Sequence, residues 1–338
     1  MRIHEIPAGD DALTRRFWEI GRAADELGRP WSGYWSWAAA RASFHASLAS
    51  AAPNRKVLLA AYDGDAMVGT AELNLPRLDN THVARLEVYV EPLHQRAGAG
   101  TALVEAAHER VAAEGRTVVL TEVATPRGTD ESPGLRLARR LGYETEVVDV
   151  MKVADLEETQ PLWEALLAET KAAAEGYTMR SWWGRCPDDL VGGFCRVIET
   201  FFSEVPVGDL DVEPQRWSEQ RLREKEERFE RAGRHETTTL VVAPDGEIVG
   251  MTEAMVSDHA PDRAFQGSTI VAPEHRGHRL GLRLKATNHL LLWRAFPGCR
   301  TVLTGNADVN AAMNAVNERL GFRPVEQVHE MQRRLVGR

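Results

Sequence analysis

Residues 91–100 read Glu-Pro-Leu-His-Gln-Arg-Ala-Gly-Ala-Gly, a glycine-rich turn between a predicted strand and a predicted helix. The strand is the apolar run Leu86–Val90, and apolar residues recur at helical spacing after the turn, at Leu103, Ala106, Ala107 and Val111. Small residues at a helix start expose consecutive backbone N–H groups, and the helix dipole adds partial positive charge there. This stretch therefore predicts a phosphate-binding turn.

Three motifs recur in the same order in both halves of the chain. They are Val68-Gly69 with Val249-Gly250, Val90-x-Pro92 with Val271-x-Pro273, and Leu141-Gly142-Tyr143 with Leu320-Gly321-Phe322. The first two are separated by 181 residues (249 minus 68, and 271 minus 90) and the third by 179 (320 minus 141). The repeat predicts two homologous domains, residues 1–150 and 151–338, each a central mixed β-sheet flanked by helices in a mixed α/β fold.

Composition narrows the class of protein. The chain has 338 residues, of which 43% are hydrophobic and 27% charged, and 41 basic against 50 acidic side chains give a net charge of −9. This charge disfavours nucleic acid and anionic membranes as partners. The three cysteines, Cys186, Cys195 and Cys299, have no C-x-x-C spacing, so neither a disulfide framework nor a bound metal is expected. The start lacks a signal-peptide pattern and no long uncharged apolar stretch occurs, so a cytoplasmic location is expected.

The turn resembles the acyl-CoA pyrophosphate loop of the GNAT superfamily of N-acetyltransferases, Q/R-x-x-G-x-G/A. Gln95, Gly98 and Gly100 match this loop, whereas the Rossmann and Walker A patterns fail because their further glycine or Gly-Lys pair is missing. In the second half Arg276 and Gly281 match, and Arg279 stands where the middle glycine is expected. The two-repeat arrangement is similar to that of the mycothiol synthases.

The resemblance implies acetyl-CoA as co-substrate in both halves, with no metal. The residues that it assigns to the cofactor in the first half are Val88, Val90, Gln95, Arg96, Ala97, Gly98, Ala99, Gly100 and Thr101. In the second half they are Ile270, Val271, Arg276, Gly277, His278, Arg279, Leu280, Gly281, Asn306 and Asn310. Asn310 is equally well explained as the N-cap of a helix that begins at Ala311.

Acetyl transfer in this superfamily is usually a direct attack by the acceptor amine, whose deprotonation at pH 7 costs about 4.6 kcal/mol. The positions where some members carry a glutamate base hold Ala84 and Phe265, and those of the usual tyrosine acid hold Ala138 and Asn317. Substitute carboxylates are Glu87, Glu122 and Glu253, and strand alternation explains them equally well. The catalytic candidates chosen from the sequence are Glu253, His259 and Asn317.

The expected activity is transfer of an acetyl group from acetyl-CoA to a small, cationic amine, by a monomer or homodimer. Acceptor contacts are expected from two aromatic clusters, although these rings would serve equally well to anchor helices. The clusters are Trp31, Tyr34, Trp35 and Trp37, and Tyr177, Trp182 and Trp183. The second half is favoured for turnover because it retains Asn306 and Asn310. The alternatives are an N-acetyltransferase acting on proteins and a regulatory protein that binds acyl-CoA without turnover. The stretch 214–233 predicts a charged, solvated helix.

Overall fold

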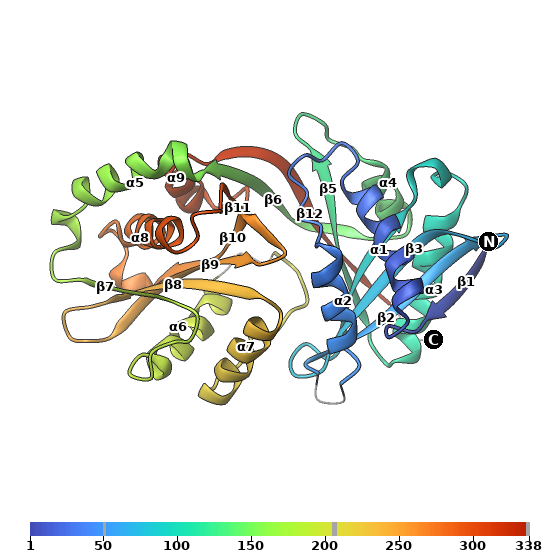
Figure 1. The fold of residues 1–338 in the computed structure, drawn as a ribbon, viewed down its shortest axis with the longest axis horizontal. Helices are drawn as coiled ribbons and strands as arrows, with labels where there is room; N and C mark the ends of the chain where they lie inside the picture. The colour runs from blue at the N-terminus through green and yellow to red at the C-terminus, as the bar shows by residue number, and fades with distance from the viewer. Residues whose placement is uncertain (50–51, 205–207, 336–338) are drawn as a thin grey trace. The chain divides into compact units, whose positions relative to one another are not determined.

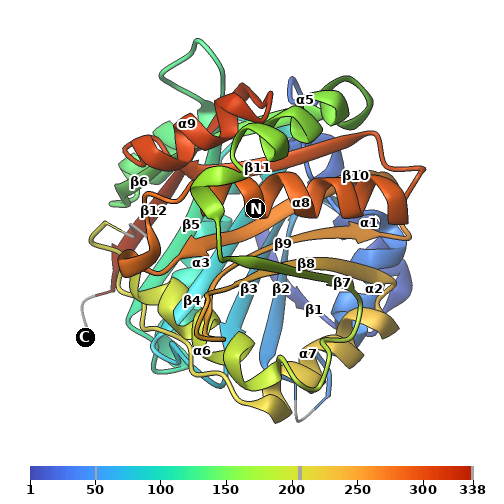
Figure 2. The ribbon, with the colours of Figure 1, turned by 90° about the vertical axis from the view of Figure 1, so that its left-hand side faces the viewer.

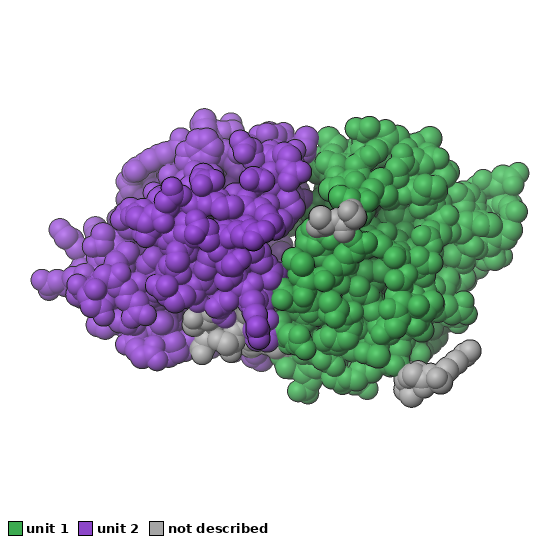
Figure 3. Space-filling model, turned by 90° about the horizontal axis from the view of Figure 1, so that it is seen from below, with its two compact units in different colours: residues 1–149, 207–213, 326–338 green, residues 150–206, 214–325 purple. Residues whose placement is uncertain are grey.

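The computed structural model describes residues 1–49, 52–204 and 208–335, and the chain divides into two compact units (Figure 3). Unit 1 comprises Met1–Asp149, Val207–Glu213 and Glu326–Arg338, and unit 2 comprises Val150–Pro206 and Pro214–Val325. The chain first changes unit between Asp149 and Val150. The C-terminal segment, which the repeat in the sequence assigned to the second domain, belongs to unit 1.

Unit 1 begins with a strand and two helices, continues through a three-stranded meander, and then alternates helix and strand (Figure 1). Its elements are β1 (Arg2–Ile6), α1 (Asp11–Asp25), α2 (Trp37–Ala46), β2 (Asn54–Asp63), β3 (Ala66–Pro76), β4 (Val83–Val90), the 3₁₀ turn η1 (Pro92–His94), α3 (Ala99–Ala113), β5 (Val118–Pro126), α4 (Pro133–Arg140) and most of β12 (Arg323–Arg334). The strand β6 (Glu144–Asp155) spans the first change of unit.

The sheet of unit 1 has the strand order β1-β2-β3-β4-β5-β12. Neighbouring strands are antiparallel, except that β4 and β5 are parallel. Alternate side chains of β3 point to opposite faces, so Leu73 and Leu75 pack with Leu103 of α3 while Glu72 faces the other side. Helices α1 and α2 cover that second face through a separate apolar cluster that includes Phe17.

Unit 2 begins with a helix and a 3₁₀ turn that unit 1 lacks, and from β7 on it repeats the succession of elements of unit 1. Its elements are α5 (Leu156–Glu169), the 3₁₀ turn η2 (Ala172–Ala174), β7 (Thr178–Trp183), α6 (Val191–Glu204), α7 (Glu219–Arg231), β8 (Arg234–Val242), β9 (Ile248–Ser257), β10 (Ala260–Val271), the 3₁₀ turn η3 (Pro273–His275), α8 (Leu280–Ala295), β11 (Thr301–Ala307) and α9 (Ala311–Arg319). The strand order is β6-β11-β10-β9-β8-β7, with β10 and β11 parallel. Helices α5 and α8 pack on one face of the sheet and α6 and α7 on the other (Figure 2).

The last strand of each repeat lies apart from the repeat to which it belongs in sequence. Strand β12 ends the second repeat but pairs along Glu326–Arg334 with β5 of unit 1, and β6 ends the first repeat but lies beside β11. The mixed α/β sheet with flanking helices, predicted for both halves, is confirmed in both units. Among the residues that the structure describes, no helix has the length and apolarity needed to cross a membrane.

Candidate functional site

The two glycine-rich turns have the same backbone shape. In unit 1, φ is 67° at Arg96 and 94° at Gly98, and in unit 2 it is 91° at Gly277 and 58° at Arg279. This left-handed region favours glycine, so each turn holds one glycine and one arginine in the two demanding positions, in opposite order. The arginine that departs from the motif therefore preserves the conformation of the turn.

Both turns open a helix whose first N–H groups are available to a ligand. Gly98 and Arg279 are the N-cap residues of α3 and α8, and neither makes a side-chain capping hydrogen bond. An anion at these ends would receive backbone N–H groups and the favourable end of the helix dipole. The structure thus gathers the predicted residues 95–101 and 276–281 into one turn in each unit.

The first residue of each motif ties the turn to the preceding strand. Gln95 donates a hydrogen bond from Nε2 to the carbonyl of Val90 at 3.3 Å, and Arg276 donates from Nε to the carbonyl of Val271 at 3.2 Å. The side chain of His278, also in this turn, has its Nδ1 3.2 Å from the carbonyl oxygen of Ala173. Its imidazole is thus directed toward the η2 segment.

The strand before each turn separates from its parallel neighbour. Strands β4 and β5 pair from Val83 to Arg85, and β10 and β11 pair from Arg263 to Phe265. Beyond these points, no further pair between the two strands is found in the described part of either unit. A diverging pair of parallel strands leaves main-chain groups of one strand open to an extended ligand. The predicted residues Val88 and Val90 lie on this stretch of β4, and Ile270 and Val271 lie on that of β10.

Unit 1 places a carboxylate on the diverging strand. Glu87 lies two residues beyond the last β4–β5 pair, on the face covered by α1 and α2, directly opposite Glu72 of β3. Glu87 is an exposed residue, yet desolvation of its carboxyl group by the surrounding protein, followed by the charge of Glu72, raises its pKa to about 7 against the attraction of Lys56. A glutamate with this pKa is suited to accept a proton at neutral pH. From the sequence alone Glu87 is only one of three substitute carboxylates, because its position opposite Glu72 depends on the register of the two strands.

Aromatic and charged side chains surround this carboxylate. The hydroxyl of Tyr89 lies 3.4 Å from Glu87 Oε2, and the ring of Tyr34 meets the Tyr89 ring edge-on at 5.5 Å. Arg29 donates two hydrogen bonds to Glu326 of β12, at 2.8 and 2.9 Å, and also pairs with Asp25. The exchanged C-terminal strand thus contributes to the surroundings of the site in unit 1.

The predicted aromatic clusters mainly anchor helices. The indole N–H of Trp18 in α1 donates to the carbonyl of Trp35 at 2.7 Å, and its ring contacts Trp37. In unit 2, Trp182 of β7 packs edge-on against Phe194 of α6. Tyr34 is the member of the first cluster that contacts the Glu87 surroundings, through Tyr89.

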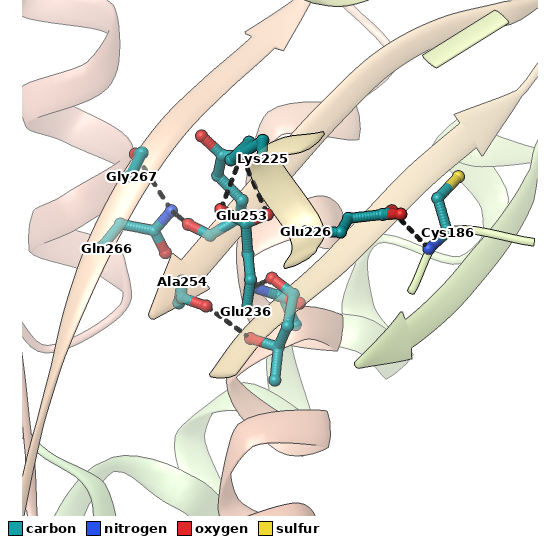
Figure 4. Close-up of polar contacts among 10 residues, drawn as sticks. Cys186, Lys225, Glu226, Glu236, Glu253, Ala254, Gln266 and Gly267 are labelled. Carbon is teal, nitrogen blue, oxygen red and sulfur yellow. Dashed lines mark hydrogen bonds and ion pairs between the residues drawn. The ribbon is translucent and has the colours of Figure 1, made fainter. Parts of the chain in front are cut away.

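In unit 2, Glu253 is held by a lysine from the charged helix. Lys225 of α7 lies 2.9 Å from both carboxylate oxygens of Glu236 and 3.5 Å from Glu253 (Figure 4). Burial lowers the pKa of Lys225, but the two carboxylates outweigh this effect and raise it above its usual range. The composition of this helix predicts that its charged side chains are solvated. Lys225 differs from that prediction, because its side chain is only 13% exposed.

The structure does not bring His259 into either site. This residue is exposed in the hairpin between β9 and β10, whereas the phosphate-binding turn follows the other end of β10 at Val271. The two ends are separated by on the order of 35 Å at about 3.3 Å per strand residue. This separation places His259 far from the phosphate-binding turn of its own unit.

The predicted asparagines of unit 2 lie in two different settings. Asn310 caps α9, since its side chain accepts a hydrogen bond from the N–H of Met313 at 3.1 Å. Asn317, fully buried, donates to Asn306 Oδ1 at 2.8 Å and accepts from Lys285 at 2.5 Å. Asn306, which is half-buried, and the buried Asn317 are thus brought together in one hydrogen-bond network.

Lys285 is the unexpected member of this network. It is 1% exposed, and burial together with the charge of Lys152 lowers its pKa to about 7. Its ammonium faces the ring of Phe322 at 5.1 Å. The equivalent position in unit 1 is Val104 (285 minus 181). Neither the repeat nor the helical apolar pattern therefore indicates that a charged side chain is buried at position 285.

Comparisons with known proteins agree with this arrangement. A model of the acetyltransferase (GNAT) family matches residues 20–143 and 204–322. A tandem GNAT protein from the clavulanic acid biosynthesis pathway is similar over 98% of both chains, with 25% identity and a TM-score of 0.78. A GCN5-related N-acetyltransferase from Sphaerobacter thermophilus has the same fold over 98% of this chain and 95% of its own, with 18% identity and a TM-score of 0.67. No curated protein gave a significant match.

Proposed function

The chain belongs to the acetyltransferase (GNAT) family, and from this premise we propose that its unit 1 moves the acetyl group of acetyl-CoA to the amine of a small cationic molecule. The family assignment makes the protein an acetyltransferase that uses acetyl-CoA as co-substrate. The acceptor class and the identity of the working unit are proposals. The observation that carries them is Glu87, a glutamate with a pKa near 7 on the diverging strand.

In this proposal the main-chain N–H groups at the start of α3 bind the pyrophosphate of the co-substrate. Glu87 takes a proton from the bound ammonium, and the freed amine attacks the thioester carbonyl carbon. The carbon–sulfur bond then breaks, the thiolate leaves, and the second amine proton is released as the amide forms. Glu87 supplies the step that an alkylamine needs at neutral pH, since only a small fraction of it is unprotonated.

The charges near Glu87 support a cationic acceptor. The carboxylates of Glu72, Glu122 and Asp25 all act on Glu87, whereas Lys56 acts in the opposite direction. The overall charge of −9 adds a long-range attraction for cations. An anionic acceptor would be repelled both by the carboxylates near Glu87 and by the net charge of the whole chain.

A screen of small amines with acetyl-CoA, followed by release of the CoA thiol, tests this proposal. We expect cationic amines to be the best acceptors and kcat/KM to fall as salt rises, with kcat little changed, because screening shortens the range of the attraction to about 8 Å at physiological salt. A best acceptor that is anionic, or a kcat/KM that rises with salt, would contradict the proposed acceptor class. No thiol release with any amine would contradict the proposed transfer itself.

A further inference from the structure

The diverging strand of unit 2 lacks the carboxylate of unit 1, because the counterpart of Glu87 is Ser268 (268 minus 87 is 181). Glu253 of β9 corresponds to Glu72 of β3 (253 minus 181), but the residue across from it is not a second carboxylate. Strand β10 has an irregular register between Gln266 and Thr269, and the strand residue beside Glu253 is Gly267. A Cβ atom on Gly267 would lie 2.9 Å from Glu253 Cγ, so the Glu253 side chain occupies the space above β10.

The carboxylates of unit 2 already hold an ammonium group. Figure 4 shows Lys225 reaching from α7 to Glu236 and Glu253, and the exposed fractions of these three side chains are 13%, 15% and 18%. In unit 1 the lysine that pairs with Glu72 is Lys56 of strand β2, and Glu87 is an exposed residue.

Aromatic rings complete the surroundings of the Lys225 ammonium. Its Nζ lies 5.2 Å from the ring centre of Phe229 and 5.8 Å from that of Trp217. Two carboxylates and two ring faces around one ammonium form the arrangement by which proteins bind organic cations. All four groups lie on the α6/α7 face of the sheet, which corresponds to the α1/α2 face that bears Glu87 in unit 1.

We propose that unit 2 carries an ammonium pocket formed by Glu236, Glu253, Trp217 and Phe229, that Lys225 of the same chain fills this pocket, and that unit 2 therefore binds acyl-CoA without transferring its acyl group to an external amine. This inference rests on the proposed function of unit 1. Unit 2 retains the turn with Arg279 that suits a phosphate, but Lys225 already pairs with Glu236 and Glu253, and the described residues 266–271 of its diverging strand include no carboxylate.

Chemical rescue tests the pocket without any turnover. Lys225→Ala removes three methylene groups and the ammonium, which together match n-propylammonium. We expect this variant to melt at lower temperature than the natural protein, and n-propylammonium chloride to restore about 2–4 °C in a saturable way. Equal concentrations of n-propanol or sodium chloride should not do so. Lys171→Ala, an exposed lysine of the same unit, is the matched control and should show no response.

Lys225→Met provides a second variant, because its side chain fills the pocket and should exclude the amine. If Lys225→Ala does not fold alone, the yield of refolding with and without n-propylammonium is the readout. Equal stabilisation of all variants, or of none, would overturn the pocket. Separately, Glu87→Gln should lower turnover at pH 7 by about 100- to 10,000-fold while two equivalents of acetyl-CoA still bind. If about half of the turnover remained, unit 2 would transfer acetyl groups, and the inference would fail although the enzyme assignment survived.

Discussion

Replacing Glu87 by glutamine tests the assignment of the proton acceptor most directly. The change keeps the size of the side chain and removes its ability to take a proton from the acceptor ammonium. General base catalysis typically contributes about 100- to 10,000-fold, so we expect kcat/KM at pH 7 to fall by that factor. The carboxyl group is accessible to water, so the substitution should not disturb folding.

The dependence of this defect on pH follows from two pKa values. With a pKa of about 7, Glu87 is half ionised at pH 7 and about one-tenth ionised at pH 6, so activity should rise as pH increases through 7 and then level off. Glu87→Gln would act only on the unprotonated amine, whose fraction rises about tenfold per pH unit below a pKa near 10.4. The natural enzyme gains only about twofold between pH 7 and pH 9, so the defect should shrink by about 50-fold over this range.

Steady-state thiol release between pH 5.5 and pH 9.5 measures both profiles. Glu109→Gln on α3 is a suitable control, because it makes the same change at an exposed position of the same unit. A Glu87→Gln variant within threefold of the natural activity at pH 7, or one that keeps the rise centred near pH 7, would refute the role of Glu87 as base.

Three further substitutions probe other parts of the structure. Gly100→Glu should abolish turnover, and calorimetry should show one equivalent of bound acetyl-CoA fewer, because the new carboxylate would repel the phosphate at α3. Gly281→Glu should remove the other equivalent and leave turnover unchanged. In the natural protein Lys285 should make the free energy of unfolding rise by about 1.4 kcal/mol per pH unit between pH 7 and pH 10. Lys285→Met should remove this contribution, as measured by urea titrations. The reason is that the unfolded lysine, with its ordinary pKa of 10.5, binds a proton that the folded one, with a pKa of about 7, lacks in this range, so the natural protein gains stability as pH rises. Glu326→Ala should cost about 3 kcal/mol in the same assay, because Arg29 would lose its bidentate partner in a largely buried pair, and an unchanged midpoint would contradict this.

Features set by local backbone geometry were predictable from the sequence. The glycine-rich turns and the helices that follow them depend on contacts between near neighbours in the chain. The repeat can be read directly by comparing the sequence with itself. Even the departure at Arg279 is local, since an arginine with φ of 58° merely exchanges places with the glycine at 277. The cap formed by Asn310 was foreseen for the same reason.

Features set by pairing between distant segments were not predictable. The position of β12 beside β5 brings Glu326 to Arg29 across 297 positions of sequence, and alternation of apolar residues does not tell which strand will be the neighbour. The raised pKa of Glu87 depends on its register with Glu72, and a shift of one residue would place its side chain on the other face. Lys225 belongs to a helix whose composition is that of a solvated surface.

The two units illustrate why a cofactor turn can persist where acceptor chemistry changes. Binding of a phosphate at a helix start depends on backbone N–H groups and the helix dipole, so Gly98 and Arg279 serve equally well provided that φ is positive. Proton transfer depends on one carboxyl group at one place, and the serine at position 268, the counterpart of Glu87, is enough to remove it. Divergence between the repeats should therefore alter the face toward the acceptor before it alters the turn. On this argument, a unit that has lost turnover is expected to keep its affinity for acyl-CoA.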